Sequence, residues 1–250
     1  MKKVKCIISY DGSGFSGFQV QPGKRTVQGA LENALTKMHK GTRVRIQASG
    51  RTDTGVHAKR QAIHFETPYS IPEANWKQAL NTLLPDDLFV QGVSFVPDSF
   101  HARYDVVEKE YRYFVWNTKE PDVFKRNYAY HFRYDLNIEA IQEACTFLEG
   151  THDFTTFSSA KATTKGSKVR TLFQLTCEKK GQEVEFTFRG NGFLYNMVRI
   201  IVGVLLDIGQ GRRKPADIIP LQEKKDRQLV GETVPPQGLY LWNVKYKKPH

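Results

Sequence analysis

The chain has 250 residues, of which 40% are hydrophobic, and 37 Lys and Arg against 26 Asp and Glu give it a net charge of +11. The hydrophobic fraction is large enough for a buried core, which argues against a chain that is disordered throughout. The excess of positive charge concerns partners rather than fold. We expect a phosphate-rich ligand, with tRNA-sized nucleic acid as the first candidate, and a basic surface that binds nothing is the alternative.

The cysteine pattern and the apolar runs bear on the cellular compartment. The three cysteines are far apart and form no CxxC motif or Cys/His cluster, so we expect neither a zinc site nor a disulfide framework. Such a pattern is typical of a reducing cytosol. The short apolar run near the N-terminus indicates a strand rather than a signal peptide. The run MVRIIVGVLLDIG contains Arg199 and is too short to span a bilayer. We therefore expect a cytoplasmic protein without membrane association.

Hydrophobic periodicity in the first half predicts four strands, at residues 3–10, 43–49, 59–66 and 88–96. Thr26 can cap a helix between the first two strands. The capping-box spacing in Ser70-Ile-Pro-Glu73 predicts a second helix before the last strand. The resulting order, β-α-β-β-α-β, is the ferredoxin-like pattern.

The second half repeats this order with longer pieces. Strands are predicted at residues 109–117, 169–179, 182–190 and 239–246. Asn137 can cap one helix and residues 194–208 form another, while a shorter helix near 215–226 looks like an insertion. We therefore expect an α+β fold of two ferredoxin-like halves, residues 1–100 and 101–250. Two such sheets side by side would leave a cleft between them.

Two polar segments have motif-like features. The segment from Gly12 to Gly17 matches G-x-G-x-x-G, but a dinucleotide site needs a helix that opens inside the motif, and the predicted helix begins only after Thr26. We therefore interpret it as a loop. Residues 158–168, SSAKATTKGSK, form a basic polar loop that is a candidate for RNA contact, although such a loop is more often solvated surface.

The segment SGRTDTGVHA places a carboxylate, Asp53, in a loop between two glycines. The triplet Asp-Thr-Gly also occurs in aspartic proteases, but that chemistry needs two carboxylates that share a proton, and the chain has no second copy. Arg51 would lower the pKa of the carboxyl group and oppose proton sharing. Taken alone, the triplet is compatible with an ordinary Asx turn.

Other residues favour a catalytic role for Asp53. Tyr111 begins an aromatic strand, and Arg199 lies in an apolar helix, where an arginine either reaches the surface or binds an anion in a cleft. Together with Arg51, these residues offer a carboxylate, two cations and a flat ring. Such a set suits a base held against an aromatic face while the carboxylate works on its sugar.

At these residues the chain resembles the bacterial tRNA pseudouridine synthase A family. The matching segments run in order over nearly the whole chain: YDGSGFSGFQVQ (10–21), SGRTDTGVHA (49–58), ALNTLLPDD (79–87), FHARYDVVEKEYRYFVWN (100–117), GTHDFTTF (150–157), GNGFLYNMVRIIVG (190–203) and GLYLWNVKY (238–246). Jointly they are highly specific, although no single segment would be.

The resemblance implies a function and a set of site residues. It implies a homodimer without cofactor or metal that isomerises uridine to pseudouridine at positions 38, 39 and 40 of the anticodon arm of tRNA. By position, Asp53 corresponds to the catalytic aspartate, Tyr111 to the tyrosine that stacks on the base, and Arg199 to the arginine that pairs with the aspartate. Arg51 is expected to contact the substrate. A non-catalytic RNA-binding protein is the alternative.

Overall fold

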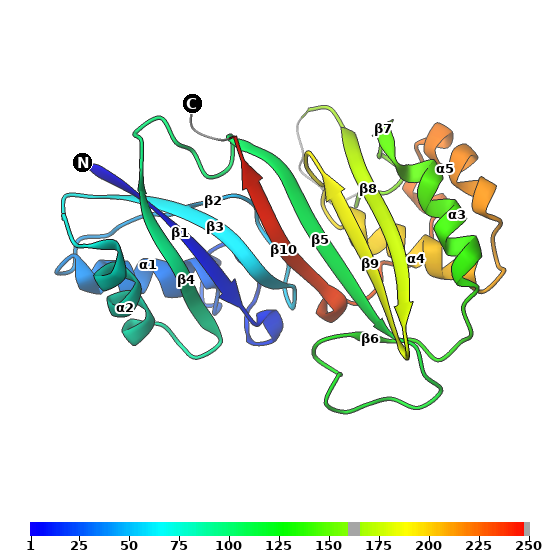
Figure 1. Ribbon diagram of the computed structural model, residues 1–250, viewed down its shortest axis with the longest axis horizontal. Helices are drawn as coiled ribbons and strands as arrows, with labels where there is room; N and C mark the ends of the chain where they lie inside the picture. Colours follow the sequence, from blue (N-terminus) through cyan, green and yellow to red (C-terminus); the bar gives the residue numbers. More distant parts are fainter. Residues whose placement is uncertain (160–165, 248–250) are drawn as a thin grey trace. The chain divides into compact units, whose positions relative to one another are not determined.

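The structure, a computed structural model, describes residues 1–159 and 166–247 and divides into two units (Figure 1). The first comprises Met1–Val107 and the segment that begins at Tyr240, and the second comprises Glu108–Leu239. The sequence-based division at residue 100 assigned the last strand to the second half. In the structure this strand pairs with a strand of the first unit, with Tyr240 opposite His57.

The first unit is built on a sheet whose strands follow the order β4 (Leu88–Val96), β1 (Lys2–Tyr10), β3 (His57–Thr67) and β10 (Leu239–Tyr246). Strand β1 is antiparallel to both neighbours, and β10 is parallel to β3. The short strand β2 (Gln47–Ala48) also pairs with β3. The two helices of the unit are α1 (Val27–Met38) and α2 (Glu73–Leu83). The order β-α-β-β-α-β is the predicted one.

The helices of the first unit pack on the face of β1 whose residues are buried. Trp76 on α2 contacts Phe65 edge-on, with ring centroids 5.3 Å apart, and Phe65 lies opposite Val4 of β1. Both aromatic side chains are almost completely buried. As predicted, the Thr26 hydroxyl caps α1, because it accepts a hydrogen bond from the N–H of Gly29 at 3.2 Å.

The predicted capping box of α2 is wrong. The residue before the helix is Pro72, which offers no capping side chain, and the helix begins at Glu73. The carboxylate of Glu73 instead accepts a hydrogen bond from the backbone N–H of Phe95 on β4, at 2.9 Å. The side chain therefore ties the helix to the edge of the sheet.

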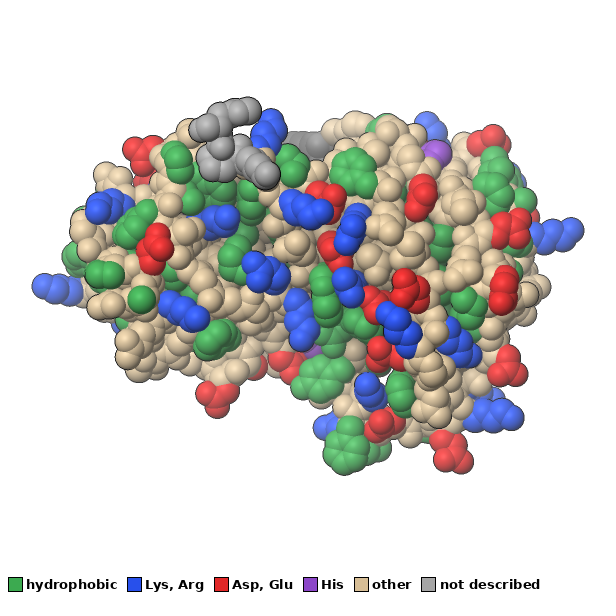
Figure 2. Space-filling view, viewed as in Figure 1, with side chains coloured by type: hydrophobic (Ala, Val, Ile, Leu, Met, Phe, Trp, Pro, Cys, Tyr) green, Lys and Arg blue, Asp and Glu red, His purple; other side chains and the backbone are tan. Residues whose placement is uncertain are grey.

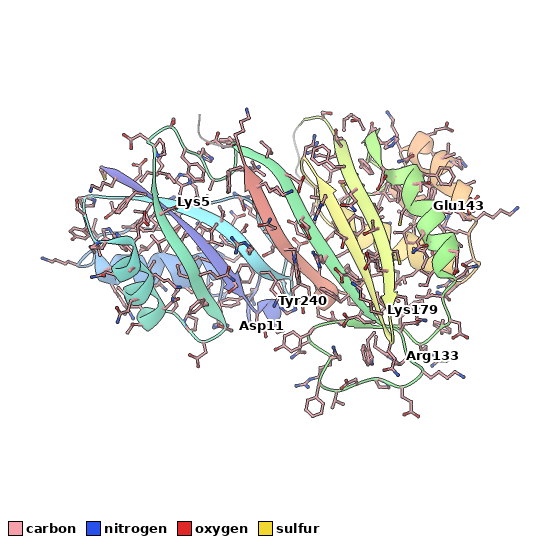
Figure 3. All side chains as sticks on the ribbon, viewed as in Figure 1. Lys5, Asp11, Arg133, Glu143, Lys179 and Tyr240 are labelled. Atoms are coloured by element: carbon pink, nitrogen blue, oxygen red, sulfur yellow. The ribbon has the colours of Figure 1, made fainter. Side chains whose placement is uncertain are left out.

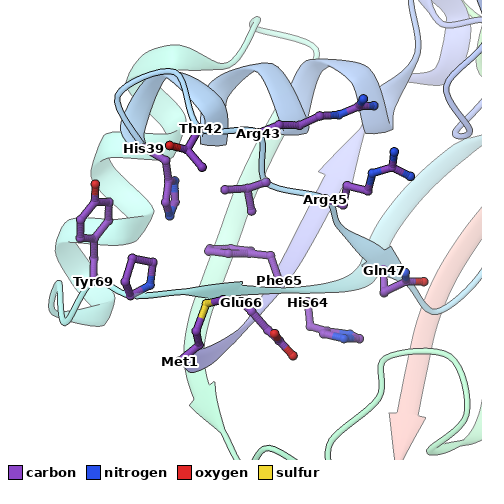
Figure 4. Close-up of a pocket in the computed structure, with 12 residues that line it drawn as sticks. Met1, His39, Thr42, Arg43, Arg45, Gln47, His64, Phe65, Glu66 and Tyr69 are labelled. Atoms are coloured by element: carbon purple, nitrogen blue, oxygen red, sulfur yellow. The ribbon is translucent and has the colours of Figure 1, made fainter.

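The strand predicted over residues 43–49 is much shorter in the structure. Only Gln47 and Ala48 pair with β3. The N–H of Ile46 donates to the buried carboxylate of Glu32 on α1 at 3.2 Å, so this part of the chain follows the helix instead of the sheet. The divergence leaves a pocket of about 750 Å³ between residues 42–47 and β3 (Figure 4).

The second unit is built on an antiparallel sheet with the strand order β5 (Val106–Trp116), β9 (Glu183–Gly190), β8 (Val169–Lys180) and β7 (Gly150–Asp153). A short strand, β6 (Tyr130–His131), pairs with β5 in parallel. The helices are α3 (Ile138–Leu148), α4 (Met197–Gly209) and α5 (Ile218–Lys224). Asn137 caps α3 as predicted, since its side chain accepts from the N–H of Ala140 at 2.9 Å.

The predicted RNA-contact loop is only partly covered by the described residues. Lys161 and Lys165, in the candidate RNA-contact loop 158–168, lie outside them. Within residues 1–159 and 166–247, no helix is long and apolar enough to cross a membrane.

Candidate active site

Asp53 lies on the connection between β2 and β3, in a turn that the main chain closes by itself. The carbonyl of Asp53 accepts a hydrogen bond from the N–H of Val56 at 3.1 Å, and Gly55 has a φ of +77°. A positive φ at the third residue of such a turn favours glycine. The Asp53 side chain is half-buried, while Arg51 and Thr54 are exposed. The turn therefore holds a carboxylate near the surface of the first unit.

The glycine loop, residues 12–18, packs against both ends of this turn. The N–H of Phe18 donates to the carbonyl of Thr52 at 3.0 Å. Gly17 has a φ of +87°, and a Cβ atom there would lie 3.1 Å from the same carbonyl oxygen. At the other end, a Cβ atom on Gly12 would lie 2.1 Å from the carbonyl oxygen of Val56. The glycines of the G-x-G-x-x-G match thus allow two stretches of main chain to approach closely.

His57, directly after the turn, is buried below it. Its Nδ1 atom lies 3.0 Å from the N–H nitrogen of Gly12 and 3.2 Å from a carboxylate oxygen of Asp11. Its ring stacks on Tyr240 at 4.5 Å (Asp11 and Tyr240 are labelled in Figure 3). Because a backbone N–H only donates, a neutral Nδ1 accepts from Gly12, whereas a protonated Nδ1 would donate to Asp11. The ring is 2% exposed, which gives His57 a structural role in supporting the turn.

Buried hydrogen bonds also hold the residues that precede the Asp53 turn. The amide of Gln61 donates to the carbonyl of Gly50 at 2.7 Å and accepts from the hydroxyl of Ser49. Gln61 and Ser49 are both fully buried. Because a buried amide that loses a partner is costly, this network fixes the chain before Arg51.

In the second unit, Tyr111 lies on β5 opposite Phe188 of β9. Its ring is 9% exposed and meets Phe193 edge-on, with centroids 5.0 Å apart. Phe193 belongs to the segment that connects β9 with α4. The tyrosine ring is thus largely buried and in contact with a ring of the segment that leads into α4.

Arg199 lies near the start of α4 and is half-buried. Its Nε donates to the carbonyl of Val234 at 2.7 Å, and its Nη1 donates to the side chain of Asn196 at 3.0 Å. The next carbonyl, that of Pro235, accepts from the hydroxyl of Tyr113 at 2.7 Å. Two adjacent carbonyls therefore join the helix of Arg199 to the strand that carries Tyr111. Burial raises the pKa of Tyr113 well above its usual value, and the nearby charge of Arg199 opposes this shift.

The predicted site residues thus divide between the units, with Arg51 and Asp53 in the first and Tyr111 and Arg199 in the second. The sequence did not identify Gly12 and Gly17 as supports of the Asp53 turn. Both occur in YDGSGFSGFQVQ, one of the segments that carry the family resemblance, which was the available signal.

Comparison with known proteins assigns the chain to a family. A sequence model of the tRNA pseudouridine synthase family matches residues 6–105 and 144–247. The tRNA pseudouridine synthase A of Oceanobacillus iheyensis is 62% identical over 99% of this chain and 98% of its own length. The proteins of the same name from Geobacillus kaustophilus and Bacillus subtilis are 55% and 54% identical, each over 98% of this chain and over 95% and 99% of their own lengths.

The class is that of the pseudouridine synthases. Within it, the chain belongs to the tRNA pseudouridine synthase family. Among solved structures, one chain of a Cbf5–Nop10–Gar1 complex is similar over 81% of this chain and 54% of its own length, at 12% identity. The TM-score of 0.35 is too low to bear on the fold.

Proposed function

We infer that this protein is an isomerase that converts uridine to pseudouridine in tRNA. The observation that carries the inference is the similarity to tRNA pseudouridine synthase A of Oceanobacillus iheyensis, at 62% identity over 99% of the chain. The net charge of +11 supports a polyanionic substrate, because Lys and Arg side chains bind phosphates.

The reaction breaks the bond between C1′ of the ribose and N1 of the uracil and forms a bond between C1′ and C5. The proton on C5 is released to solvent and N1 takes up a proton, so substrate and product have the same composition. Nothing is oxidised or reduced and no group is gained, so the reaction balances without a cofactor or a metal.

We propose that Asp53 is the catalytic residue and acts at the sugar. A carboxylate can attack the sugar carbon as a nucleophile or remove a proton from the sugar, and both routes need an ionised oxygen that reaches the ribose. The half-buried side chain and the braced turn support this role, because a fixed main chain lowers the cost of aiming the carboxylate.

The remaining site residues would bind the substrate. The target uridine must leave its stack to be reached, which costs a few kcal/mol, and stacking on Tyr111 would return ~1–3 kcal/mol of this. The ring of Tyr111 is already held by Phe193, so little freedom is lost on binding. Arg199 would keep Asp53 ionised, and the exposed Arg51 would contact a phosphate or the base.

We propose three further properties of the enzyme. The modified uridines are those at positions 38, 39 and 40 of the anticodon arm, the enzyme acts as a homodimer, and it works in the cytoplasm, where bacterial tRNA is transcribed and used. The names of the relatives support the tRNA substrate.

Tritium release tests the activity. Unmodified tRNA transcribed with 5-tritiated uridine should release tritium to water when the purified protein is added, because isomerisation frees the hydrogen on C5. Transcripts that carry cytidine in place of uridine at positions 38, 39 and 40 should release none. Tight binding of tRNA without tritium release would overturn the proposed activity and would favour a non-catalytic RNA-binding protein.

A further inference from the structure

A loop of the second unit exposes large aromatic side chains. The tip loop, residues 118–134, connects β5 with α3 and contains β6 (Figure 1). Phe124 is 83% exposed and the neighbouring Val123 is 60% exposed. Figure 2 shows hydrophobic side chains beside Lys and Arg side chains on this loop. Neighbouring exposed apolar side chains with charged residues around them are typical of an interaction surface.

Hydrogen bonds hold a turn in the middle of the tip loop. The carboxylate of Asp122 accepts from the N–H of Phe124 at 2.8 Å, and its carbonyl accepts from the N–H of Lys125 at 3.0 Å. The guanidinium of Arg126 donates to the carbonyl of Val123 at 2.6 Å. These bonds define the main-chain conformation of the turn that carries Phe124, whose side chain is 83% exposed.

The tip loop is also anchored to the sheet. The ammonium of Lys125 lies 4.9 Å from the centre of the Trp116 ring on β5 and 3.6 Å from the carboxylate of Glu183 on β9. The side-chain amide of Asn117 donates to the carbonyl of Tyr134 at 2.8 Å. An anchored loop loses little conformational freedom when it binds a partner.

Cations accompany the exposed rings of the tip loop. Its four Lys and Arg residues, against two acidic residues, are Lys119, Lys125, Arg126 and Arg133. The guanidinium of Arg133, labelled in Figure 3, lies 5.2 Å from the centre of the Tyr134 ring, which is 50% exposed. Rings interleaved with cations are typical of surfaces that bind single-stranded nucleic acid, where bases stack and phosphates pair.

We propose that the tip loop binds the RNA substrate away from the reacting uridine, with Phe124 stacked on an unpaired base and Arg126 beside a phosphate. This rests on the proposed function only in taking tRNA as the substrate. A second copy of the chain is the competing partner, but the core of a protein interface is depleted of charge, whereas the exposed rings here share the tip loop with four Lys and Arg residues.

The tip loop contains none of the proposed site residues. The family model matches residues on both sides of the loop but not residues 106–143. None of Asp53, Arg51 and Arg199 lies in the loop, and Tyr111 lies on the strand before it. Substitutions in the loop therefore test RNA binding without changing the proposed catalytic residues.

Fluorescence anisotropy with labelled, unmodified tRNA tests the proposal on the full chain. Phe124→Ala and Phe124→Leu should each weaken binding by roughly tenfold, whereas Phe124→Trp should stay within about twofold of wild type, because only an aromatic ring stacks on a base. Arg126→Ala should lower the slope of log Kd against log salt by about one. The matched control is Phe173→Ala, which removes a ring that is 50% exposed on β8 and should leave binding unchanged.

The alternatives give different results. Phe124→Ala with wild-type affinity for tRNA would overturn the proposal. A variant Phe124→Leu that binds as well as Phe124→Trp, together with a change of sedimentation in Phe124→Ala, would assign the tip to contacts between copies of the chain. Binding does not require turnover, so a loss of affinity in Phe124→Ala would stand even if the wild-type protein released no tritium. Normal tritium release with no effect of Phe124 would overturn this inference alone.

Discussion

The phenolic oxygen of Tyr10 lies 2.7 Å from the hydroxyl oxygen of Thr52, the residue that precedes Asp53. Both side chains are buried, at 5% and 7% exposed. The contact joins the end of β1 to the turn that carries the carboxylate. The carbonyl of Thr52 is held as well, by the N–H of Phe18 at 3.0 Å. Side chain and main chain of one residue thus fix the turn from two directions.

Tyr10→Phe should lower turnover more than it lowers RNA affinity. The substitution removes one buried hydrogen bond and should reduce the free energy of unfolding by about 1 kcal/mol. The larger effect is expected in the rate constant for tritium release, because a shift of the turn moves the proposed catalytic carboxylate. A cycle with Thr52→Val checks the mechanism, since the double variant should lose less than the sum of the single variants. Additive losses would show that the Tyr10–Thr52 contact does not position Asp53.

Gly17→Ala should impair both stability and turnover. The positive φ of Gly17 strains an alanine by roughly 1–2 kcal/mol, and its Cβ atom would lie 3.1 Å from the carbonyl oxygen of Thr52. Gly23→Ala is the matched control, because Gly23 also has a positive φ, of +68°, but its Cβ atom would meet nothing within 4 Å. Thermal unfolding should show a loss for both variants, larger for Gly17→Ala, and only Gly17→Ala should release tritium slowly. Equal turnover in the two variants would show that the close approach at Gly17 does not affect the reaction.

Much of the fold follows from local signals in the sequence. The caps at Thr26 and Asn137 are side-chain contacts over three residues, so their spacing predicts them. The segment before β2 is different, because its alternating residues suit a strand while Ile46 bonds the distant Glu32. Only the folded chain decides between these partners.

The candidate site shows the same division. Asp53 is marked by its motif and by the family resemblance, which point to the residue itself. The residues that support the Asp53 turn are harder to predict, because Gly12 and Gly17 matter only through their close approach to the main chain of another loop. The motif G-x-G-x-x-G indicates that another stretch of main chain comes close to this loop. It does not indicate which stretch that is.

Arg199→Met should lower turnover by roughly 10²–10³-fold while tRNA affinity stays within about tenfold, as expected for a cation that acts on a reacting group. Arg227→Met is the control, because Arg227 holds the same segment as Arg199 by donating to the carbonyl of Val230 at 2.6 Å and to the hydroxyl of Thr233 at 3.2 Å. Single-turnover tritium release and anisotropy measure the two effects. A similar loss of turnover in Arg227→Met would reduce Arg199 to a structural anchor.

The stability of the first unit should fall in mild acid through His64. Burial lowers the pKa of His64 to about 4, with neighbouring His101 and Lys3 adding to the shift and Asp105 opposing it. Its Nδ1 accepts the N–H of Ala102 at 3.1 Å, which requires the neutral ring. Between pH 6.5 and about 4 the unfolded chain binds more protons than the folded one, so stability decreases as the pH falls, by on the order of 3 kcal/mol.

Urea unfolding at pH 7 and pH 5 checks the role of His64. His64→Asn keeps an acceptor for Ala102 and removes the titration, so the variant should lose less stability between these two pH values than the wild type does. An unchanged difference between pH 7 and pH 5 would assign the acid sensitivity to other groups.

The most direct measurement is tritium release from 5-tritiated tRNA by Asp53→Asn under single-turnover conditions. Asparagine keeps the size of the side chain, and the main chain closes the turn through the Asp53 carbonyl, so the fold should be retained. It removes the charge and the basicity that the reaction needs. We predict that release falls by roughly 10³-fold or more, while tRNA affinity stays within roughly tenfold, about 1.4 kcal/mol. Release by a pure Asp53→Asn preparation at a rate near that of the wild type would contradict the assignment of Asp53 as the catalytic residue.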